Sequence, residues 1–456
     1  MKKALLLFFV STVAFGSGYE KSVLWGGKYS GVAGSAAAGV TGSDSIFYNP
    51  AGLVNSPELG DITFNLSSGS AQFKGPIVPK ANPLMAPATP PGTPTGSTTF
   101  TRANVQESSK TSSTVVPGVT YSMKLNDSWS YGLGYYAVGG TRAIYEDVDF
   151  APRNFKAKIG SEITISEFSA GVGYKVSDAM RLGLGLRYTM TDASFSSVGY
   201  GMGSAPFGST VAAITNVDIK DIKTANLDGV RLGMQYDVSE NTKLGLVIRT
   251  ETKVSKTAKA SGVVNSCGAS CQTITTHAIP EADVKVDTVL PMAINLGVEH
   301  KLTDTWTLFG ELVHTQYSKI EKVDLDGTIL VTAGGTTTDT PIPDIDQKWK
   351  DQLNVKLAAQ YSGMSWPVRF GYIHTSDVSN KQYARASFTP PGAAATYTLG
   401  TGQEFKIGES PLDFNIAIDY TTVKGDSDDS VQPLYTPAGS YEASSTAIHT
   451  GFAYKF

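Results

Sequence analysis

The chain repeats one pattern along nearly its whole length. Segments in which apolar and polar residues alternate are joined first by a tight polar turn and then by a long Gly/Ser/Thr-rich connection. The tight turns are KLNDSW (124–129), KVSDAM (175–180), DVSENTK (237–243), KLTDTW (301–306), YSGMSW (361–366) and IGESPL (407–412). The longer connections lie near 74–110, 141–160, 196–224, 257–283, 319–348, 377–399 and 424–441. Because period-two alternation is typical of strands, these six hairpins and seven connections predict about fourteen antiparallel strands.

The two kinds of connection predict two different ends of the folded molecule. Bacterial outer-membrane barrels have short turns in the periplasm and long loops outside the cell. A soluble β-sandwich or propeller has no reason to separate its connections by length. The expected fold class is therefore all-β membrane: an antiparallel transmembrane β-barrel of about 14 strands, formed by residues 61–456, in the outer membrane of a Gram-negative cell.

The alternation also predicts which side chains face lipid. Near 180–192 the residues of one parity are Leu182, Leu184, Leu186, Tyr188 and Met190, and those of the other are Arg181, Gly183, Gly185, Arg187, Thr189 and Thr191. Segments near 230–236 and 412–420 repeat this contrast. The apolar set is expected to face lipid and the small or polar set to face the lumen.

The N-terminus has the features of an export signal. Two lysines and an apolar run precede the small residues Ala14 and Gly16, at the spacing that a signal peptidase reads. We expect a signal peptide over 1–16 and a mature chain that starts at Ser17, with Gly18 as the alternative. That run is too short to span a bilayer. A net charge of −4 and the lack of a basic block argue against nucleic acid as a partner.

The C-terminus and three tryptophans fit the same architecture. The chain ends on aromatic residues at alternate positions, with Phe456 last, which resembles the signal by which the barrel-assembly machinery recognises its substrates. Trp129, Trp306 and Trp366 each stand at the end of a tight turn, where an interfacial aromatic belt is expected.

Residues 17–60 do not alternate, yet they are rich in small and aromatic residues. A barrel of this strand number encloses a wide lumen, so we expect this segment to fill it as an N-terminal hatch, or plug. A flexible periplasmic tail is the alternative, although such a tail would contain fewer aromatic residues.

The hatch segment carries the most specific family resemblance. Its opening SGY, its small-residue run and the motif DSIFYNPAGL (44–53) resemble the hatch of the FadL/TodX family of hydrophobic-compound transporters. The likeness continues through VVPGVTYSMKLNDSWSYGLGYY, VIRTETKVS, VLPMAINLGVEHKLTDTWTL and RFGYIHTS. The hatch residues matched to the family are Ser17, Gly18, Asn49, Pro50 and Ala51. The resemblance implies that a fatty acid or hydrocarbon docks outside, enters a lumenal pocket beside the hatch and leaves sideways into the bilayer.

One long connection predicts the docking surface. The stretch 193–217 contains no charged residue and carries the apolar candidates Tyr200, Met202, Phe207 and Ile214. An exposed apolar loop needs a partner, and the loop near 257–283 would form the other wall of a groove. A loop that only packs on its neighbours remains the alternative.

Parity places four arginines on the lumenal face: Arg187, Arg231, Arg249 and Arg369. Glu299, Glu311 and Asp419 share that face, so pairing between arginine and carboxylate is the simple expectation. An arginine left for the ligand would bind a fatty-acid carboxylate. A neutral hydrocarbon stays open as the substrate.

Glycines in the third strand predict the exit. The segment WSYGLGYYAVGG (129–140) contains Gly132, Gly134, Gly139 and Gly140, and glycine inside a strand permits bulges and bends. The family resemblance places a lateral opening at a kink in this strand.

Other chemistry is sparse in the sequence. Cys267 and Cys271 predict a small disulfide in an extracellular loop of an exported protein. No catalytic, cofactor or metal motif is recognised, so we expect no enzyme, no cofactor and no metal site. Acidic residues in KGDSDDS (424–430) could bind an ion between lipopolysaccharides, but a solvated loop is favoured. A general porin is the main alternative function, followed by an adhesin or a barrel enzyme.

Overall fold

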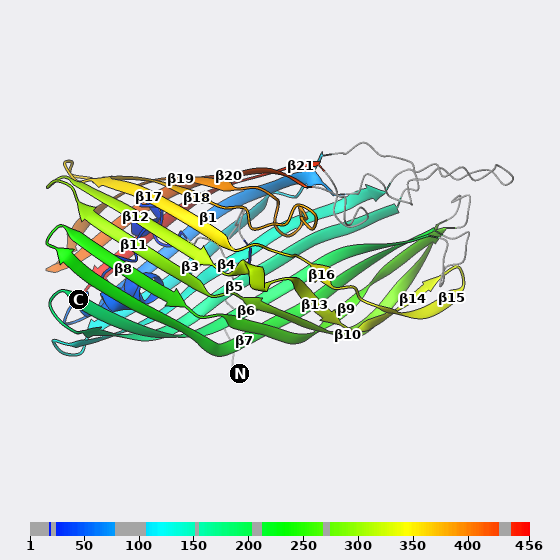
Figure 1. The fold of residues 1–456 in the computed structure, drawn as a ribbon, viewed down its shortest axis with the longest axis horizontal. Coiled ribbons are helices and arrows are strands. Elements are labelled where there is room, and N and C mark those ends of the chain that lie inside the picture. The colour runs from blue at the N-terminus through cyan, green and yellow to red at the C-terminus, as the bar shows by residue number, and fades with distance from the viewer. Residues whose placement is uncertain are drawn as a thin grey trace.

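The structure, a computed structural model, describes residues 18–19, 24–77, 106–150, 155–202, 212–267, 274–427 and 439–456. Within this part of the chain, fourteen strands pair antiparallel in a closed ring. The order around the wall is β1, β3, β4, β5, β6, β7, β8, β11, β12, β17, β18, β19, β20 and β21. Pairing of β21 with β1 closes the barrel, so the all-β membrane architecture is confirmed (Figure 1).

The elements have the following bounds. The hatch contains α1 (Gly27–Ser30), η1 (Gly42–Asp44), α2 (Ser45–Tyr48) and η2 (Pro50–Asn55). The first strands are β1 (Asp61–Pro76), β2 (Gln106–Ser108), β3 (Ser112–Lys124), β4 (Trp129–Phe150), β5 (Phe155–Lys175), β6 (Met180–Met202) and β7 (Ala212–Ser239). Then come β8 (Thr242–Arg249), β9 (Thr252–Cys267), β10 (Ile274–Leu290), β11 (Ala293–Lys301), β12 (Trp306–Thr315), η4 (Tyr317–Lys319) and β13 (Lys322–Asp326). The last are β14 (Thr328–Ala333), β15 (Thr336–Pro341), β16 (Ile345–Asp346), β17 (Gln352–Tyr361), β18 (Val368–Thr375), β19 (Ala394–Ile407), β20 (Ser410–Ser427) and β21 (Gly439–Lys455).

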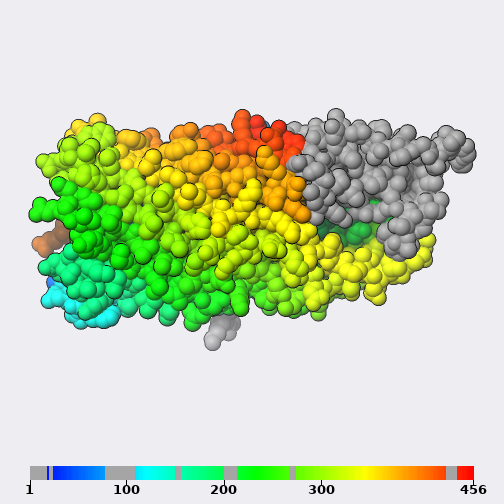
Figure 2. All heavy atoms as spheres, in the orientation of Figure 1, coloured from blue at the N-terminus to red at the C-terminus, as the bar shows by residue number. Residues whose placement is uncertain are grey.

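All six predicted tight turns are present and gather at one end of the barrel, together with the C-terminus and the hatch (Figure 1). Trp129 and Trp366 follow two of these turns and stay exposed, and Trp129 packs against Tyr174 of the next strand. This end is the periplasmic end of the wall. The coloured bands of Figure 2 change gradually from green to orange across the visible wall, because consecutive strands are neighbours.

The predicted facing of the strands is confirmed. Leu182, Leu184 and Leu186 are exposed on the outside, whereas Arg181 and Arg187 of the same strand are buried inside. Outward leucines, valines and aromatic residues form the apolar belt that lipid would cover. Among the helices of the described residues, none is long and apolar enough to cross a membrane.

The long connections contain more strand than the sequence predicts. β4 and β5 leave only 151–154 between them, and β6, β7, β9 and β10 extend deep into the stretches expected to be loops. The prediction of long loops from Gly/Ser/Thr-rich composition is therefore wrong for these strands. Threonine favours strands, and the continued pairing satisfies backbone groups above the apolar belt.

Candidate ligand path between the hatch and the barrel wall

The hatch fills the periplasmic half of the lumen and touches the wall at close range (Figure 1). A Cβ added at Gly183 of β6 or at Gly233 of β7 would overlap Pro50 and Ala51 of the hatch. A Cβ at Gly245 of β8 would overlap the backbone at Ala37. These lumenal glycines are needed because the hatch backbone lies directly on the strands.

The Asn49-Pro50-Ala51 motif fastens the hatch to itself and to the wall. The Asn49 side-chain amide donates to the carbonyl of Ala37 over 2.6 Å and to the carbonyl of Met234 in β7 over 3.0 Å. Its Oδ1 accepts from the N–H of Ala51 and so begins η2. The motif that carries the family resemblance is thus a fully bonded anchor.

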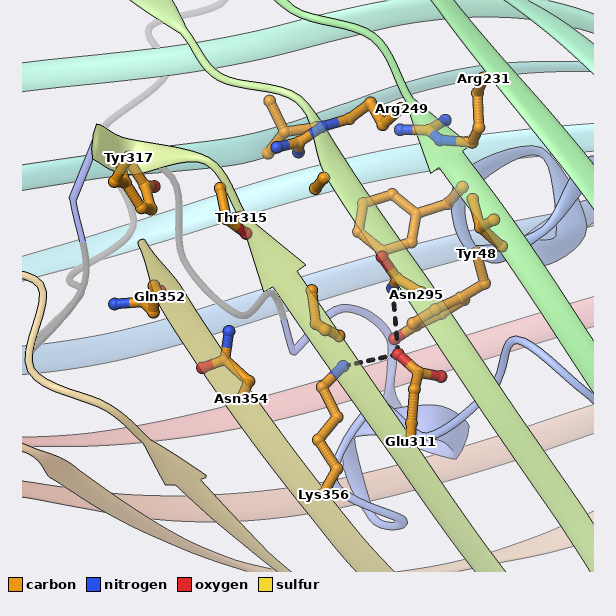
Figure 3. Close-up of a pocket in the computed structure, with 15 residues that line it drawn as sticks. Tyr48, Arg231, Arg249, Asn295, Glu311, Thr315, Tyr317, Gln352, Asn354 and Lys356 are labelled. Carbon is orange, nitrogen blue, oxygen red and sulfur yellow. Dashed lines mark hydrogen bonds and ion pairs between the residues drawn. The ribbon is translucent and has the colours of Figure 1, made fainter. Parts of the chain in front are cut away.

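A carboxylate of the wall anchors a second point of the hatch. Glu311 of β12 accepts hydrogen bonds from the N–H groups of Ala36 and Ala37, at 3.1 and 3.0 Å. Its other oxygen accepts from Asn295 and forms a 3.0 Å ion pair with Lys356 (Figure 3). Two backbone donors and a lysine compensate this buried charge.

A third anchor lies on the periplasmic side of the hatch. Asp44 is buried, and its Oδ1 accepts from Asn65 and Thr120 of the wall. Burial raises the pKa of Asp44 from 3.8 to about 7, and the nearby carboxylate of Asp61 contributes to the rise. Docking of the hatch is therefore linked to the uptake of a proton near neutral pH.

A cavity that is partly open to solvent lies on the other side of the hatch (Figure 3). Its apolar lining comes from the hatch, β4, β8, β11 and β12: Phe47, Val138, Val247, Ala293 and Val313. Its polar lining is Tyr48, Arg231, Arg249, Asn295, Glu311, Thr315, Tyr317, Gln352, Asn354 and Lys356. The lining is amphipathic, with charged and amide groups concentrated on β12 and β17.

The four candidate arginines have different surroundings. Arg187 and Arg231 both pair with the buried Glu167 of β5, at 2.6 and 3.0 Å. Arg231 also donates to the carbonyl of Ile46 in the hatch and to the hydroxyl of Tyr136 in β4. Arg187 therefore belongs to a structural cluster, while Arg231 belongs to it and also lines the cavity.

The other two arginines lie on opposite sides of the hatch. Arg369 donates to Gln360 and Asn415 beside Gly31, toward the periplasmic end, and does not line this cavity. Arg249 lines the cavity next to Arg231 (Figure 3). The remaining predicted lumenal carboxylates are paired as well: Glu299 with Lys243 and Asp419 with His449.

The backbone ladder between β3 and β4 is interrupted. Their ladder runs from Lys124 paired with Ser130 to Val119 paired with Tyr135 and then stops. In the described chain the next backbone bond across this seam joins the N–H of Lys110, just before β3, to the carbonyl of Ile144 in β4. Residues 111–118 and 136–143 thus face each other without a ladder, although each strand stays paired with its other neighbour, β1 or β5.

A bulge in β4 accompanies this interruption. The register against β5 shifts between Ala137 and Gly139, and Gly140 has a φ of 150°, which favours glycine. The bulged Val138 is buried and lines the cavity. Gly132 and Gly134 lie instead in the regular ladder, where a Cβ would overlap Leu53 and Ile46 of the hatch.

Sequence reasoning missed residues on both sides of this seam. Pro117 of β3 lies in the stretch that has no β4 partner, and proline is confined to sheet edges because it lacks an N–H. On the lumenal side, Tyr136 packs against Trp25 and Phe47 of the hatch, with ring centroids 5.5 and 4.8 Å away. The proline was a usable signal, whereas the aromatic cluster depends on tertiary contacts.

Several predicted site residues lie elsewhere or outside the described residues. Ile214 belongs to β7 and is buried, so it does not form part of an exposed loop. The backbones of Tyr200 and Met202 end β6, but their side chains are outside the described residues, as is all of Phe207. Cys267 ends β9, and Cys271 and Ser17 lie outside the described residues. Gly18 is buried against Tyr317.

Comparisons with known proteins agree with this architecture. Residues 8–456 match the family model described as "Outer membrane protein transport protein (OMPP1/FadL/TodX)". NMB0088 of Neisseria meningitidis serogroup B, named as an outer membrane protein, is 25% identical over 439 residues, covering 90% of this chain and 88% of the relative.

Two solved structures share the fold. The crystal structure of a Pseudomonas aeruginosa FadL homologue has a TM-score of 0.71 at 17% identity and covers 96% of this chain and 100% of that one. The Pseudomonas putida toluene transporter TodX has a TM-score of 0.64 at 14% identity, covering 97% and 99%. The closed barrel, the internal hatch and the family match over nearly the whole chain lead to one conclusion: the chain belongs to the FadL/TodX family of outer-membrane transport proteins.

Proposed function

We propose that the protein carries a hydrophobic compound from the cell surface into the outer membrane, and that this compound is an amphiphile such as a long-chain fatty acid. Extracellular segments capture it, the cavity beside the hatch holds it, and the interrupted seam between β3 and β4 releases it into lipid. The toluene transporter TodX shares the fold, which makes a neutral hydrocarbon the nearest alternative substrate.

The observation that carries the proposal is the two-sided lining of the cavity. Val138, Val247 and Val313 offer an apolar wall, and Arg249, Asn354 and Lys356 offer charged and amide groups. Lys356 and Asn354 already have partners in Glu311 and Thr375. A purely apolar ligand would still offer no hydrogen bond to the polar atoms that it covers, which is unfavourable. An amphiphile matches both sides.

Release into lipid is favoured over release into water. Each CH₂ kept out of water contributes roughly 0.8 kcal/mol, so a long chain is held strongly unless its exit also leads into an apolar phase. Val138, at the β4 bulge, lines the cavity, which supports an exit through the interrupted seam between β3 and β4. The hatch closes the periplasmic half of the lumen and is held to the wall by Asn49 and Glu311, which disfavours an axial path for the ligand.

The same features weigh against the other functions. A general porin needs an open lumen, whereas the hatch of this chain is packed against lumenal glycines. The matched family model describes transport proteins, which favours transport over catalysis or adhesion.

The test replaces Gly139 and Gly140 with valine. Valine does not adopt the φ of Gly140, so the variant favours a regular β4 that continues its ladder with β3. Uptake of a long-chain fatty acid should fall at least tenfold, while surface binding persists and the barrel remains folded. Gly199→Val is the control, because a Cβ at Gly199 has only one neighbour, 3.9 Å away.

Two further outcomes are informative. Unchanged uptake through a wall shown to be closed would refute lateral release and revive an axial channel. The alkane of the same length serves as a second ligand, and uptake of the alkane equal to that of the acid would replace the amphiphile with a neutral hydrocarbon.

A further inference from the structure

The connection between β18 and β19 does not project outward from the barrel. Residues 376–393, called here the crossing segment, join these two strands at the extracellular half and are drawn as an orange coil in Figure 1. Val378, Ser379 and Phe388 of this segment are among its buried residues, and its Lys381 is exposed. A surface loop of eighteen residues would normally leave most of its side chains in water.

The two ends of the crossing segment are held by the wall from which it starts. The carbonyl of Val378 accepts a 2.8 Å hydrogen bond from the N–H of Lys350, just before β17. At the other end Gly392 has a φ of 117°, and a Cβ there would overlap the carbonyl of Lys424 in β20. These contacts join the segment to its own side of the barrel.

The middle of the segment reaches the opposite wall. Phe388 stacks on Phe195 of β6, with ring centroids 5.0 Å apart and planes at 23°. The Ser161 hydroxyl of β5 donates to the carbonyl of Ser387. In the strand order, β5 and β6 are separated from β18 and β19 by at least five strands in either direction. The crossing segment therefore spans the lumen.

The contacts with the far wall differ in kind from those of the hatch. The hatch is anchored by Glu311 and Arg231 through buried charges, and by glycines that let backbones touch. The crossing segment meets β6 through two stacked rings and β5 through a neutral hydroxyl. Neither of these two contacts involves a charge, so breaking them strands no buried charge on β5 or β6. The charged residue of the middle stretch, Arg385, lies instead near Tyr441 of β21, the neighbour of β20.

We propose that the crossing segment is the extracellular gate of the lumen, and that residues 384–389 swing away from β5 and β6 to admit ligand to the cavity above the hatch. The inference rests on the proposed transport function for its purpose but not for its geometry. The protein then has two closures with the ligand cavity between them: the hatch, held by buried charges, and the crossing segment, held at the far wall by uncharged contacts.

The experiment locks the gate. In the Ser161→Cys/Ser387→Cys variant, oxidation should join the crossing segment to β5. The matched control is Thr396→Cys/Thr421→Cys, whose native hydroxyls are 2.8 Å apart on β19 and β20 and whose bridge would not touch the segment. Mass spectrometry establishes each bridge, and wild-type protein treated with the same reductant controls for Cys267 and Cys271.

Two measurements separate this inference from the proposed function. The first is uptake of a long-chain fatty acid, expected to fall at least tenfold in the locked protein, to recover on reduction and to be normal in the control. The second needs no transport: Thr315→Cys, placed in the cavity lining, is labelled from outside with a membrane-impermeant maleimide. Labelling should be at least tenfold slower when the gate is locked.

The outcomes are distinct. Absence of fatty-acid uptake by the wild-type protein, together with gated labelling in the cysteine variants, would overturn the proposed function and leave the gate intact. Failure of positions 161 and 387 to be joined, either by oxidation or by a short bifunctional maleimide, would show that the segment does not cross the lumen. Equal labelling in locked and reduced protein would show that it does not gate. Either result overturns the inference.

Discussion

A few buried charged side chains hold the hatch in this barrel, and each of them would destabilise the fold if it had no partner of opposite charge. Glu167 is fully buried between Arg187 and Arg231 and also accepts from Ser169 and Tyr136. Removing one member of a buried ion pair leaves an uncompensated charge and typically costs about 3–5 kcal/mol. Since Arg231 also binds the carbonyl of Ile46, this cluster links β4, β5, β6 and β7 with the hatch.

Asp44 makes the docking of the hatch depend on pH. The pKa of Asp44 is about 7 when the hatch is docked, against 3.8 for the exposed group, so the docked state binds the extra proton. Docking should therefore weaken as pH rises from about 4 to about 7 and change little above that. Between pH 5.5 and 7.5 the opening equilibrium should shift by up to about twentyfold.

Hydrogen exchange of residues 43–55, corrected for the intrinsic effect of pH, measures this opening. Asp44→Asn should remove the dependence and slow exchange at pH 7.5, because the amide avoids the cost of a buried charge. Asp127→Asn, in an exposed periplasmic turn, is the control and should behave as wild type. An Asp44→Asn protein that keeps the full pH dependence would contradict the assignment.

At the scale of elements, the hatch and the strands fit each other through glycine. Two lumenal glycines of β6 provide a matched pair: a Cβ at Gly183 would overlap the Pro50–Ala51 backbone, whereas a Cβ at Gly185 has its nearest neighbour at 3.7 Å. Both lie on the same face of one strand, and their contacts with the hatch differ. The wall therefore limits where the hatch can lie.

Gly183→Ala should displace the hatch without unfolding the barrel. The added methyl group meets backbone atoms, which cannot rotate away, so η2 has to shift from β6. We expect protease added from the periplasmic side to cleave residues 24–55 at least fivefold faster than in wild type, while the barrel keeps its resistance. Gly185→Ala should be cleaved at the wild-type rate, and equal cleavage of the two variants would argue against close packing.

The sequence predicted elements well where the signal was local. The six tight turns and the alternation of leucine with arginine or glycine are properties of neighbouring residues, and both are confirmed. The upper strands were misjudged because Gly/Ser/Thr-rich segments can be loops or paired strands. Only the partner strand, such as β9 beside the start of β7, settles that choice.

At the scale of the whole molecule, the lumen is closed twice. The hatch occupies the periplasmic half, and the crossing segment spans the extracellular half from β18 and β19 to β5 and β6. Reconstituted in a planar bilayer, the protein should show no steady ohmic conductance, although a barrel of this strand number is wide enough for an aqueous pore.

Brief current openings in the bilayer should become more frequent in Gly183→Ala, because this variant loosens the hatch. Gly185→Ala is again the control. A steady conductance in the wild-type protein, comparable to that of an open porin, would instead favour the general-porin alternative.

The sequence by itself determined the number of strands, their facing, the location of the tight turns and the existence of a hatch, because each follows from the pattern of neighbouring residues. Together with the family resemblance, its four glycines Gly132, Gly134, Gly139 and Gly140 also pointed to β4 as a strand that could bend. Only the tertiary structure decided the rest. Which arginine is bound by Glu167, which residues line the cavity and where residues 376–393 cross all depend on contacts between strands distant in sequence. Period-two alternation cannot specify these contacts, since it assigns a side chain to the lumen without saying what lies across from it.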